Sequence, residues 1–363
     1  MLNLSLLAAR PRNAAPPSRR RERGQVLMMT ALLLPILLGF AALAVDVGSY
    51  ADHRRTMQNA ADSIALAASH DLPDPSATRL SANKWAVKND IDPNDMTVTI
   101  LPVGNGTLNP TVRVVVTEPH QFSFARILGI DSKPVGARAA AIKTSPGGGA
   151  NLLPFAVTLA TQIAAEPGDP VTLKYDSNDP TAGNFGIIRL DGSGSNVYKD
   201  TIMNGSDSTV CVYGVTTCQD TSPVCDQSVC QSQTGNLVGA TRDGVDYRIN
   251  NTDAECDTFD EVLNPGTTAG TFVIEKLCNP WIDGGYSSLR LVVVPVIQNL
   301  CNGSCDYTIV KFALFFLDGY EGGKCTGSVC EIKGRFVNAD ATIGALSGTY
   351  DPTAPIHFTR LSE

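Results

Sequence analysis

The first stretch with a clear hydrophobic pattern is a run of twenty uncharged residues, 26–45. About twenty helical residues cross a hydrocarbon core of ~30 Å. Pro35 lies within the run, and a membrane helix tolerates it because neighbouring helices or a local kink can satisfy the freed backbone carbonyl. The pattern therefore predicts a transmembrane helix over residues 25–45.

The charges on either side of this run predict its direction in the membrane. The tail, residues 1–24, contains six arginines against a single acidic residue, Glu22. By the positive-inside rule, this basic tail stays in the cytoplasm and the chain from Asp46 onward is exported. A cleaved signal peptide ending near Ala42-Leu43-Ala44 is the alternative, although its apolar region is normally only ~7–15 residues long. We expect a single-pass protein of the cell membrane whose bulk lies outside the cytoplasm.

Residues 46–145 are predicted to continue the helix and then form a small α/β head. From Val47 to Ala68 the apolar residues recur at steps of three and four, as on one face of a helix, once Arg54 fills a gap between Tyr50 and Met57. The span and this segment are therefore predicted to form one rod, which ends near His70 before a proline-containing breaker. The elements expected in the head are helices at 76–89 and 122–128 and strands at 96–101, 112–116 and 135–142.

The chain then changes in composition. Residues 146–150 are predicted to be a glycine-rich linker, because they lack side chains that would fix a geometry. Residues 151–363 are expected to form a mainly-β domain, sandwich or barrel-like, and the whole chain an α+β protein. The apolar runs expected as strands are 155–159, 171–175, 185–190, 289–296, 308–316, 332–337 and 356–361, with one helix at 238–250.

The charge balance bears on the ligands of the exported part. The chain has 28 basic and 36 acidic residues, and the tail contains six and one of these, which leaves 22 and 35 in the other 339 residues. A net charge of −13 argues against a nucleic-acid ligand. With 43% hydrophobic and 18% charged residues, the composition is that of a folded chain.

All ten cysteines follow residue 210. An even number in an exported segment predicts disulfides, whose connectivity the sequence leaves open. The alternative is a zinc site formed by the last two cysteine pairs, whose spacings zinc modules also use, but histidine is absent near both pairs and the compartment is oxidising. The disulfide candidates are Cys211, Cys218, Cys225, Cys230, Cys256, Cys278, Cys301, Cys305, Cys325 and Cys330.

The N-terminal region also carries a set of short motifs. They are Arg23-Gly24-Gln25, Ala31-Leu32-Leu33-Leu34-Pro35, Leu38-Gly39, Ala44-Val45-Asp46-Val47-Gly48, Arg55, Gln58-Asn59-Ala60-Ala61-Asp62 and Ala65-Leu66-Ala67. Together they resemble the N-terminal segment of Flp/Tad pilus assembly proteins of the TadG-like kind. The resemblance covers residues 23–70 closely and the head, to residue 144, more loosely.

This resemblance implies a non-enzymatic, membrane-anchored and outward-facing component of a pilus system. Its implied partners are the membrane and other pilus-assembly or envelope proteins, with self-association through a pilin-like N-terminal helix. The family motif and membrane-boundary positions are Gly24, Pro35, Asp46, Gln58 and Asp62. Type IV prepilins carry a Glu at the position of Met29, and its absence here argues against cleavage after Gly24.

Asp46 follows the span directly, and two interpretations remain open for it. A carboxylate at the outer edge of the membrane reaches water or headgroups, so Asp46 can simply end the span. In the sharper hypothesis it pairs with a cation on a partner subunit.

Motifs for enzyme chemistry are sparse. The four histidines are scattered, the nucleophile elbow and the phosphate loop are absent, and no cofactor is predicted. One loop, with Asp191, Ser193 and Ser195, is similar to the metal site of von Willebrand A domains, and its oxygen ligands suit Mg²⁺ in a metal-dependent adhesin. That fold needs crossover helices, so we interpret the loop as a hairpin turn between strand-like flanks at 187–190 and 196–198. An exported hydrolase of unrecognised type is a third hypothesis.

Overall fold

The structure is a computed structural model that describes residues 22–104, 108–176, 185–266, 270–282, 288–340 and 346–362. The chain forms two compact units, each of which is discontinuous in sequence. The first unit contains residues 1–59 and 117–137, and the second contains residues 60–116 and 138–363.

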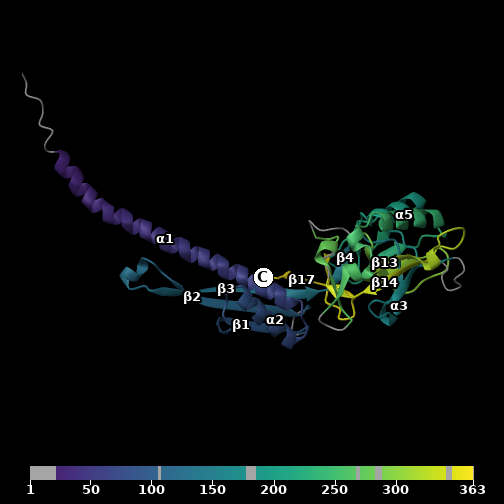
Figure 1. The fold of residues 1–363 in the computed structure, drawn as a ribbon, viewed down its shortest axis with the longest axis horizontal. Helices are drawn as coiled ribbons and strands as arrows, with labels where there is room; N and C mark the ends of the chain where they lie inside the picture. The colour runs from purple at the N-terminus through teal and green to yellow at the C-terminus, as the bar shows by residue number, and fades with distance from the viewer. Residues whose placement is uncertain are drawn as a thin grey trace, which may run out of the picture. The chain divides into compact units, whose positions relative to one another are not determined.

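Helix α1 (Glu22–Ser69) is continuous over 48 residues and includes Pro35 (Figure 1). The predicted single rod is therefore confirmed. Residues 26–45 are almost entirely exposed, and α1 is long and apolar enough to cross a membrane. From residue 60 onward α1 contributes to the second unit, where small and branched side chains such as Ala61, Ile64 and Ala68 are fully buried. Helix propensity of the alanines and burial of this stripe both favour the helix.

In the first unit, α1 is accompanied by the ends of two strands, β2 (Thr111–Gln121) and β3 (Ser132–Thr144). Figure 1 shows both strands beside α1. The connection between them contains a short 3₁₀ helix, η2 (Ala125–Leu128), where the sequence predicts a helix at 122–128. Gly129 ends η2 in the left-handed region, with φ of 83°.

The second unit contains the rest of the head. Helix α2 (Pro75–Lys88) begins at the N-cap Asp74, whose carboxylate accepts hydrogen bonds from two backbone N–H groups. After η1 (Pro93–Asp95), strand β1 (Met96–Leu101) pairs antiparallel with β2. The predicted helix at 76–89 and strand at 96–101 are confirmed.

One sheet joins the head to the end of the chain. Its seven strands lie in the order β1-β2-β3-β17-β15-β11-β10. Strand β17 (Ile356–Leu361) pairs antiparallel with β3, with Phe358 opposite Thr144. The other members are β15 (Ala339–Asp340), β11 (Phe272–Ile274) and β10 (Leu263–Pro265). Strands from both sides of the predicted boundary at 146–150 therefore share this sheet.

The predicted linker is a strand in the structure, which corrects that expectation. Residues 146–149 form β4 (Pro146–Gly149), which is buried and pairs with β7 (Val210–Cys211) and β16 (Leu346–Ser347). A Cβ at Gly147 would lie only 2.8 Å from the Cα of Gly348. The glycines here permit a close backbone approach, where the sequence suggests flexibility.

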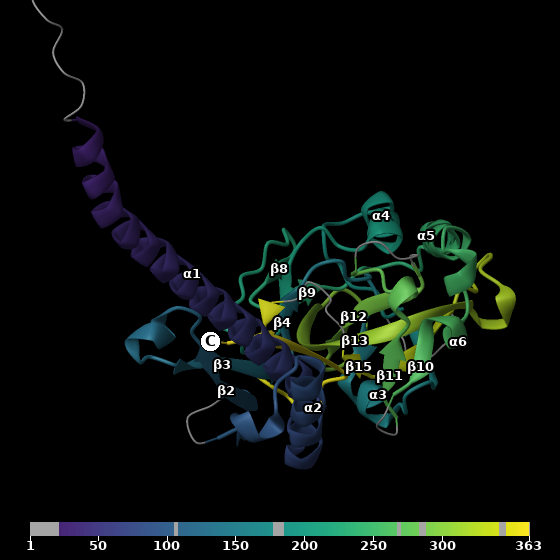
Figure 2. The same cartoon turned by 60° about the vertical axis from the view of Figure 1, so that its left-hand side comes forward.

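The second unit has its core around a central antiparallel hairpin. Strands β12 (Leu291–Ile297) and β13 (Asp306–Tyr320) are flanked by β5 (Val157–Thr158), β14 (Ile332–Val337) and β6 (Pro170–Lys174). Alternate residues of the hairpin enter two separate hydrophobic clusters, so β12 and β13 are buried on both faces. Helices α4 (Ser195–Asn204) and α5 (Val238–Asn250) pack against one cluster (Figure 2).

The unit is thus a mixed α+β structure with antiparallel sheets, and helices cover part of what was expected as a β-sandwich or barrel-like domain. The helix predicted at 238–250 is confirmed, whereas 185–190 forms only isolated bridges and α4 was not predicted. The remaining elements are α3 (Leu159–Ala164), β8 (Cys225–Asp226), β9 (Val229–Gln231), η3 (Ala254–Cys256), α6 (Phe259–Val262), η4 (Lys276–Cys278) and η5 (Glu321–Gly323).

Candidate membrane-boundary site

Asp46 lies on α1 directly after the apolar run, and its side chain is buried, with 3% of its surface exposed. Its carboxylate accepts hydrogen bonds from three successive backbone N–H groups of the β2–β3 connection. The donor–acceptor distances are 2.9 Å from Ser123, 3.1 Å from Phe124 and 2.6 Å from Ala125. Asp46 thus binds its own chain, and its pairing with a cation on a partner subunit stays a hypothesis.

These contacts determine the ionisation of Asp46. Burial disfavours the charged form, but the hydrogen bonds from the three backbone N–H groups outweigh it and hold the pKa of Asp46 below its ordinary value. His120 also contributes in this direction. The carboxylate is therefore ionised when the loop is bound to it, and the bonds are charge-assisted.

A cluster of aromatic and histidine side chains continues this contact along α1. Ser49 Oγ lies 3.2 Å from His120 Nε2, and the ring of Tyr50 stacks on Phe122 with centroids 6.2 Å apart. His53 Nε2 lies 3.9 Å from a carboxylate oxygen of Glu118. The first unit is therefore held by a line of polar and aromatic contacts between one face of α1 and β2.

The other motif residues lie along the same helix. Gly24 and Pro35 are within α1, and Gln58 and Asp62 are half-buried further along it. The residues that sequence reasoning missed are those opposite Asp46. Ser123, Phe124 and Ala125 act through backbone N–H groups, which every residue except proline has, so their side chains give no signal of the contact.

The ten cysteines form five disulfides, and each disulfide joins a cysteine to the next cysteine along the chain. The pairs are Cys211–Cys218, Cys225–Cys230, Cys256–Cys278, Cys301–Cys305 and Cys325–Cys330. Both pairs of the alternative zinc site are thus bonded internally, which removes the thiolates that zinc requires. Among the described residues, no group of three or more His, Cys, Asp or Glu side chains is placed to hold a metal ion.

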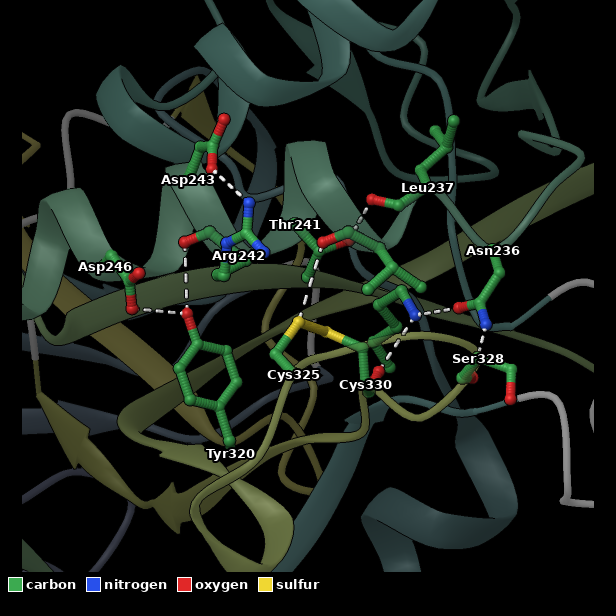
Figure 3. Close-up of a disulfide and its surroundings, with 12 residues drawn as sticks. Asn236, Leu237, Thr241, Arg242, Asp243, Asp246, Tyr320, Cys325, Ser328 and Cys330 are labelled. Carbon is green, nitrogen blue, oxygen red and sulfur yellow. Dashed lines mark hydrogen bonds and ion pairs between the residues drawn. A yellow bond between two sulfur atoms is a disulfide. The ribbon is translucent and has the colours of Figure 1, made fainter.

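The Cys325–Cys330 disulfide is tied to the core by a buried lysine. Lys174 Nζ donates to Asn236 Oδ1 at 2.6 Å and to the carbonyl oxygen of Cys330 at 2.9 Å. Asn236 in turn donates to the carbonyl oxygen of Ser328 at 2.7 Å (Figure 3). Burial lowers the pKa of Lys174 to about 8, although Asp176 and Glu331 act in the opposite direction. The ammonium group of Lys174 is thus engaged in hydrogen bonds, and its geometry is that of a structural support for the disulfide-bonded loop.

The Asp191 loop differs from the predicted hairpin turn. Ser195 begins helix α4, so residues 196–198 are helical and form no strand-like arm. The carboxylate of Asp191 accepts hydrogen bonds from Ser208 N at 2.9 Å and from Thr201 Oγ1 at 3.2 Å, while Ser193 and Ser195 are exposed. The unit around the loop is built mainly of antiparallel pairs, whereas a nucleotide-type fold needs parallel strands with crossover helices.

Comparison with known protein families relates the N-terminal segment to one of them. Residues 24–71 match the family model Tad, described as Flp pilus-assembly TadE/G-like. The N-terminal segment is a TadE/G-like domain. The match includes the apolar run, Asp46, Gln58 and Asp62, which the motifs pointed to. No curated protein and no solved structure matches the chain.

The TadE/G-like match ends near the end of α1. The connection that binds Asp46 and the disulfide-bonded part of the second unit both lie outside it. The match therefore relates the N-terminal segment to pilus-assembly proteins, and α1 has the length and apolar composition of a membrane anchor or a signal sequence. The five disulfides indicate an oxidising, extracytoplasmic location for the part that contains them.

Proposed function

We propose that this protein is a membrane-anchored, outward-facing component of a Flp/Tad-type pilus assembly system, with a structural and interaction role and no catalytic one. The observation that carries the proposal is the construction of α1. One continuous helix is apolar and solvent-exposed over residues 26–45. From residue 60 one side of the same helix is buried in a disulfide-bonded unit. Such a helix contributes both the proposed membrane span and a buried segment of the exported body.

Several further features support this assignment. The arginine-rich tail orients the N-terminus toward the cytoplasm by the positive-inside rule. The TadE/G-like match spans the same helix. In the proposed arrangement the exported body presents its surface to other pilus or envelope proteins, and neighbouring copies associate through the N-terminal helix.

Orientation is tested by cysteine labelling in intact cells. The ten native cysteines are paired, so the wild-type chain provides an unlabelled background. Ala15→Cys places a thiol in the tail, and Thr56→Cys places one at an exposed position of α1. A membrane-impermeant maleimide should label only the second variant in intact cells and both after lysis. Labelling of both from outside, or a mature protein that lacks the apolar run, would refute the anchor.

The pilus role is tested by deletion and complementation. Loss of the gene should reduce the number of assembled pili, and the wild-type chain should restore it. Ser193→Ala with Ser195→Ala is the matched variant for the adhesin hypothesis, because both side chains are exposed and their loss should leave the fold intact. Full restoration by this variant supports the structural role. Restored pili that have lost divalent-cation-dependent adhesion would favour the adhesin instead.

A further inference from the structure

The connection between β2 and β3, residues 122–131, exposes an unusual amount of apolar surface for ten residues. We call it the apolar loop. Its exposed apolar side chains are Phe124 at 43%, Ile127 at 83%, Leu128 at 82% and Ile130 at 52%. Apolar side chains gathered at one exposed place mark a surface that a membrane or a partner covers.

The exposure belongs to an ordered turn. Phe122 N donates to the carbonyl oxygen of Asp131 at 3.0 Å, which closes the base of the loop. Ile130 N donates to the carbonyl oxygen of Ala125 at 3.1 Å, which closes η2. The side chains of Ile127 and Leu128 are therefore held outward by a defined backbone.

The contacts along α1 show which end of the helix the loop approaches. Three pairs of contacting residues define the direction, and they are Glu118 with His53, His120 with Ser49, and Ser123 with Asp46. Each step along β2 toward the loop is a step along α1 toward the apolar run. Ile127 and Leu128 follow Ser123 in the same connection, so the loop tip lies at the level where the apolar run ends.

We propose that the apolar loop inserts into the outer interface of the same membrane that α1 spans. This inference rests on the anchoring role of α1 given above. The occupant is the lipid bilayer, because the loop is bonded to Asp46, and the residues of α1 that precede Asp46 form the span itself. The apolar side chains of the loop thereby extend an apolar surface that already faces lipid.

The charged side chains at the loop are of both signs. Arg126 lies within η2, with Nε 3.8 Å from a carboxylate oxygen of Asp131, and Lys133 follows the loop; all three side chains are exposed. Basic side chains beside an apolar tip can place their charge at lipid phosphates while their stems lie along the apolar surface. The hydrogen bonds of Asp46 fix the loop to the end of the span, so they also fix the depth at which the loop enters.

The experiment uses the full-length protein in vesicles of phosphatidylcholine and phosphatidylglycerol. An environment-sensitive nitrobenzoxadiazole probe is attached at Leu128→Cys, and lipids with a nitroxide at carbon 5 or carbon 12 of the acyl chain serve as quenchers. Two matched positions on α1 are Leu37→Cys in mid-span and the exposed Thr56→Cys. Thr56 lies ten residues past Asp46, about 15 Å beyond the span at the helical rise.

The probe at residue 128 should be quenched more by the carbon-5 lipid than by the carbon-12 lipid, since interfacial segments enter only ~5–10 Å. The probe at residue 37 should be quenched by the deeper label, and the probe at residue 56 by neither. If residue 37 is quenched and residue 128 behaves like residue 56, the anchor holds and the insertion is refuted. Blue-shifted emission at residue 128 without lipid quenching indicates a protein cover, such as a second copy, and also refutes insertion. If residue 37 is not quenched, the anchor itself fails.

Discussion

Two apolar stretches of this chain have opposite environments. In strand β13, Phe315 and Leu314 are fully buried, because both faces of the hairpin are covered by protein. In the apolar loop, Ile127 and Leu128 keep more than four-fifths of their surface exposed. The difference shows that an apolar stretch becomes part of a core only when the same chain provides layers on each side of it. Among the described residues of its own unit, no such layer covers the loop, and the proposed cover is lipid.

The largest expected effect is the contrast between Phe315→Ala and Leu128→Ala. Removing the buried phenyl ring of Phe315 leaves a cavity and should lower the free energy of unfolding of the second unit by about 3–5 kcal/mol. Leu128→Ala removes an exposed side chain and should change it by less than about 0.5 kcal/mol. Denaturant unfolding of the full chain in detergent micelles, followed by near-UV circular dichroism, measures both. A comparable loss for the two variants would mean that the loop is part of the folded core.

The disulfides sharpen the same comparison, since they stabilise only the second unit. Replacing Cys256 and Cys278 together by serine opens a loop with a separation of 22 residues, whereas the Cys225–Cys230 pair closes one of 5. Chain entropy predicts losses of about 3 and about 2 kcal/mol respectively. The same unfolding measurement should rank the two variants in this order, and neither should change the protection of the Asp46 contact. The reverse order would show that strain or lost packing, and not loop closure, dominates the effect.

The comparison also explains how far the sequence could predict this structure. The long N-terminal apolar helix and α5 follow from strong continuous or periodic patterns, and both occur where predicted. Helix α4 was missed because its start, Ser195-Asn196-Val197-Tyr198, is poor in strong helix formers, and packing of Tyr198 and Ile202 in the core decides its conformation.

The predicted linker failed for a different reason. Glycine is favoured both in flexible segments and where two backbones approach closely, and Pro146–Gly149 is of the second kind. Only the distant partner strands β7 and β16 distinguish the two, and the local sequence does not contain them. Only the acceptor of the Asp46 site could be predicted from the sequence, because it is a side chain. The donors are backbone N–H groups of a distant segment, which the local sequence does not reveal.

Removal of the Asp46 carboxylate should loosen the apolar loop without unfolding either unit. Asp46→Ala leaves three backbone N–H groups without their acceptor. Hydrogen exchange of residues 122–131 should speed up by at least about tenfold, since the loss of even one charge-assisted bond is expected to have that effect. Asp46→Asn keeps one acceptor oxygen and should show a smaller increase. Exchange measured by mass spectrometry on the full chain tests this. Unchanged exchange in Asp46→Ala would mean that the stacked rings of Tyr50 and Phe122 hold the loop alone.

The smallest expected effect is a dependence of the loop on acid pH. The pKa of Asp46 is held below its ordinary value of 3.8 because the three N–H groups, opposed by burial, favour the charged carboxylate. When the apolar loop is not bound to it, Asp46 therefore takes up a proton at a higher pH than it does when the loop is bound. The stabilisation is fully present above about pH 4 and is lost as the pH falls through the lowered pKa of the docked state.

The amide proton of Ala125 reports this titration directly, since it lies in the shortest of the three bonds. In full-length protein labelled with ¹⁵N-alanine, its chemical shift should be constant from neutral pH to about 4 and then move with a midpoint below 3.8. Asp46→Asn should remove the titration, whereas changes common to both proteins would report other groups. A midpoint above 3.8 would mean that burial outweighs the hydrogen bonds. In that case the loop would be held to α1 mainly by its aromatic contacts, and Asp46 would serve chiefly to end the span.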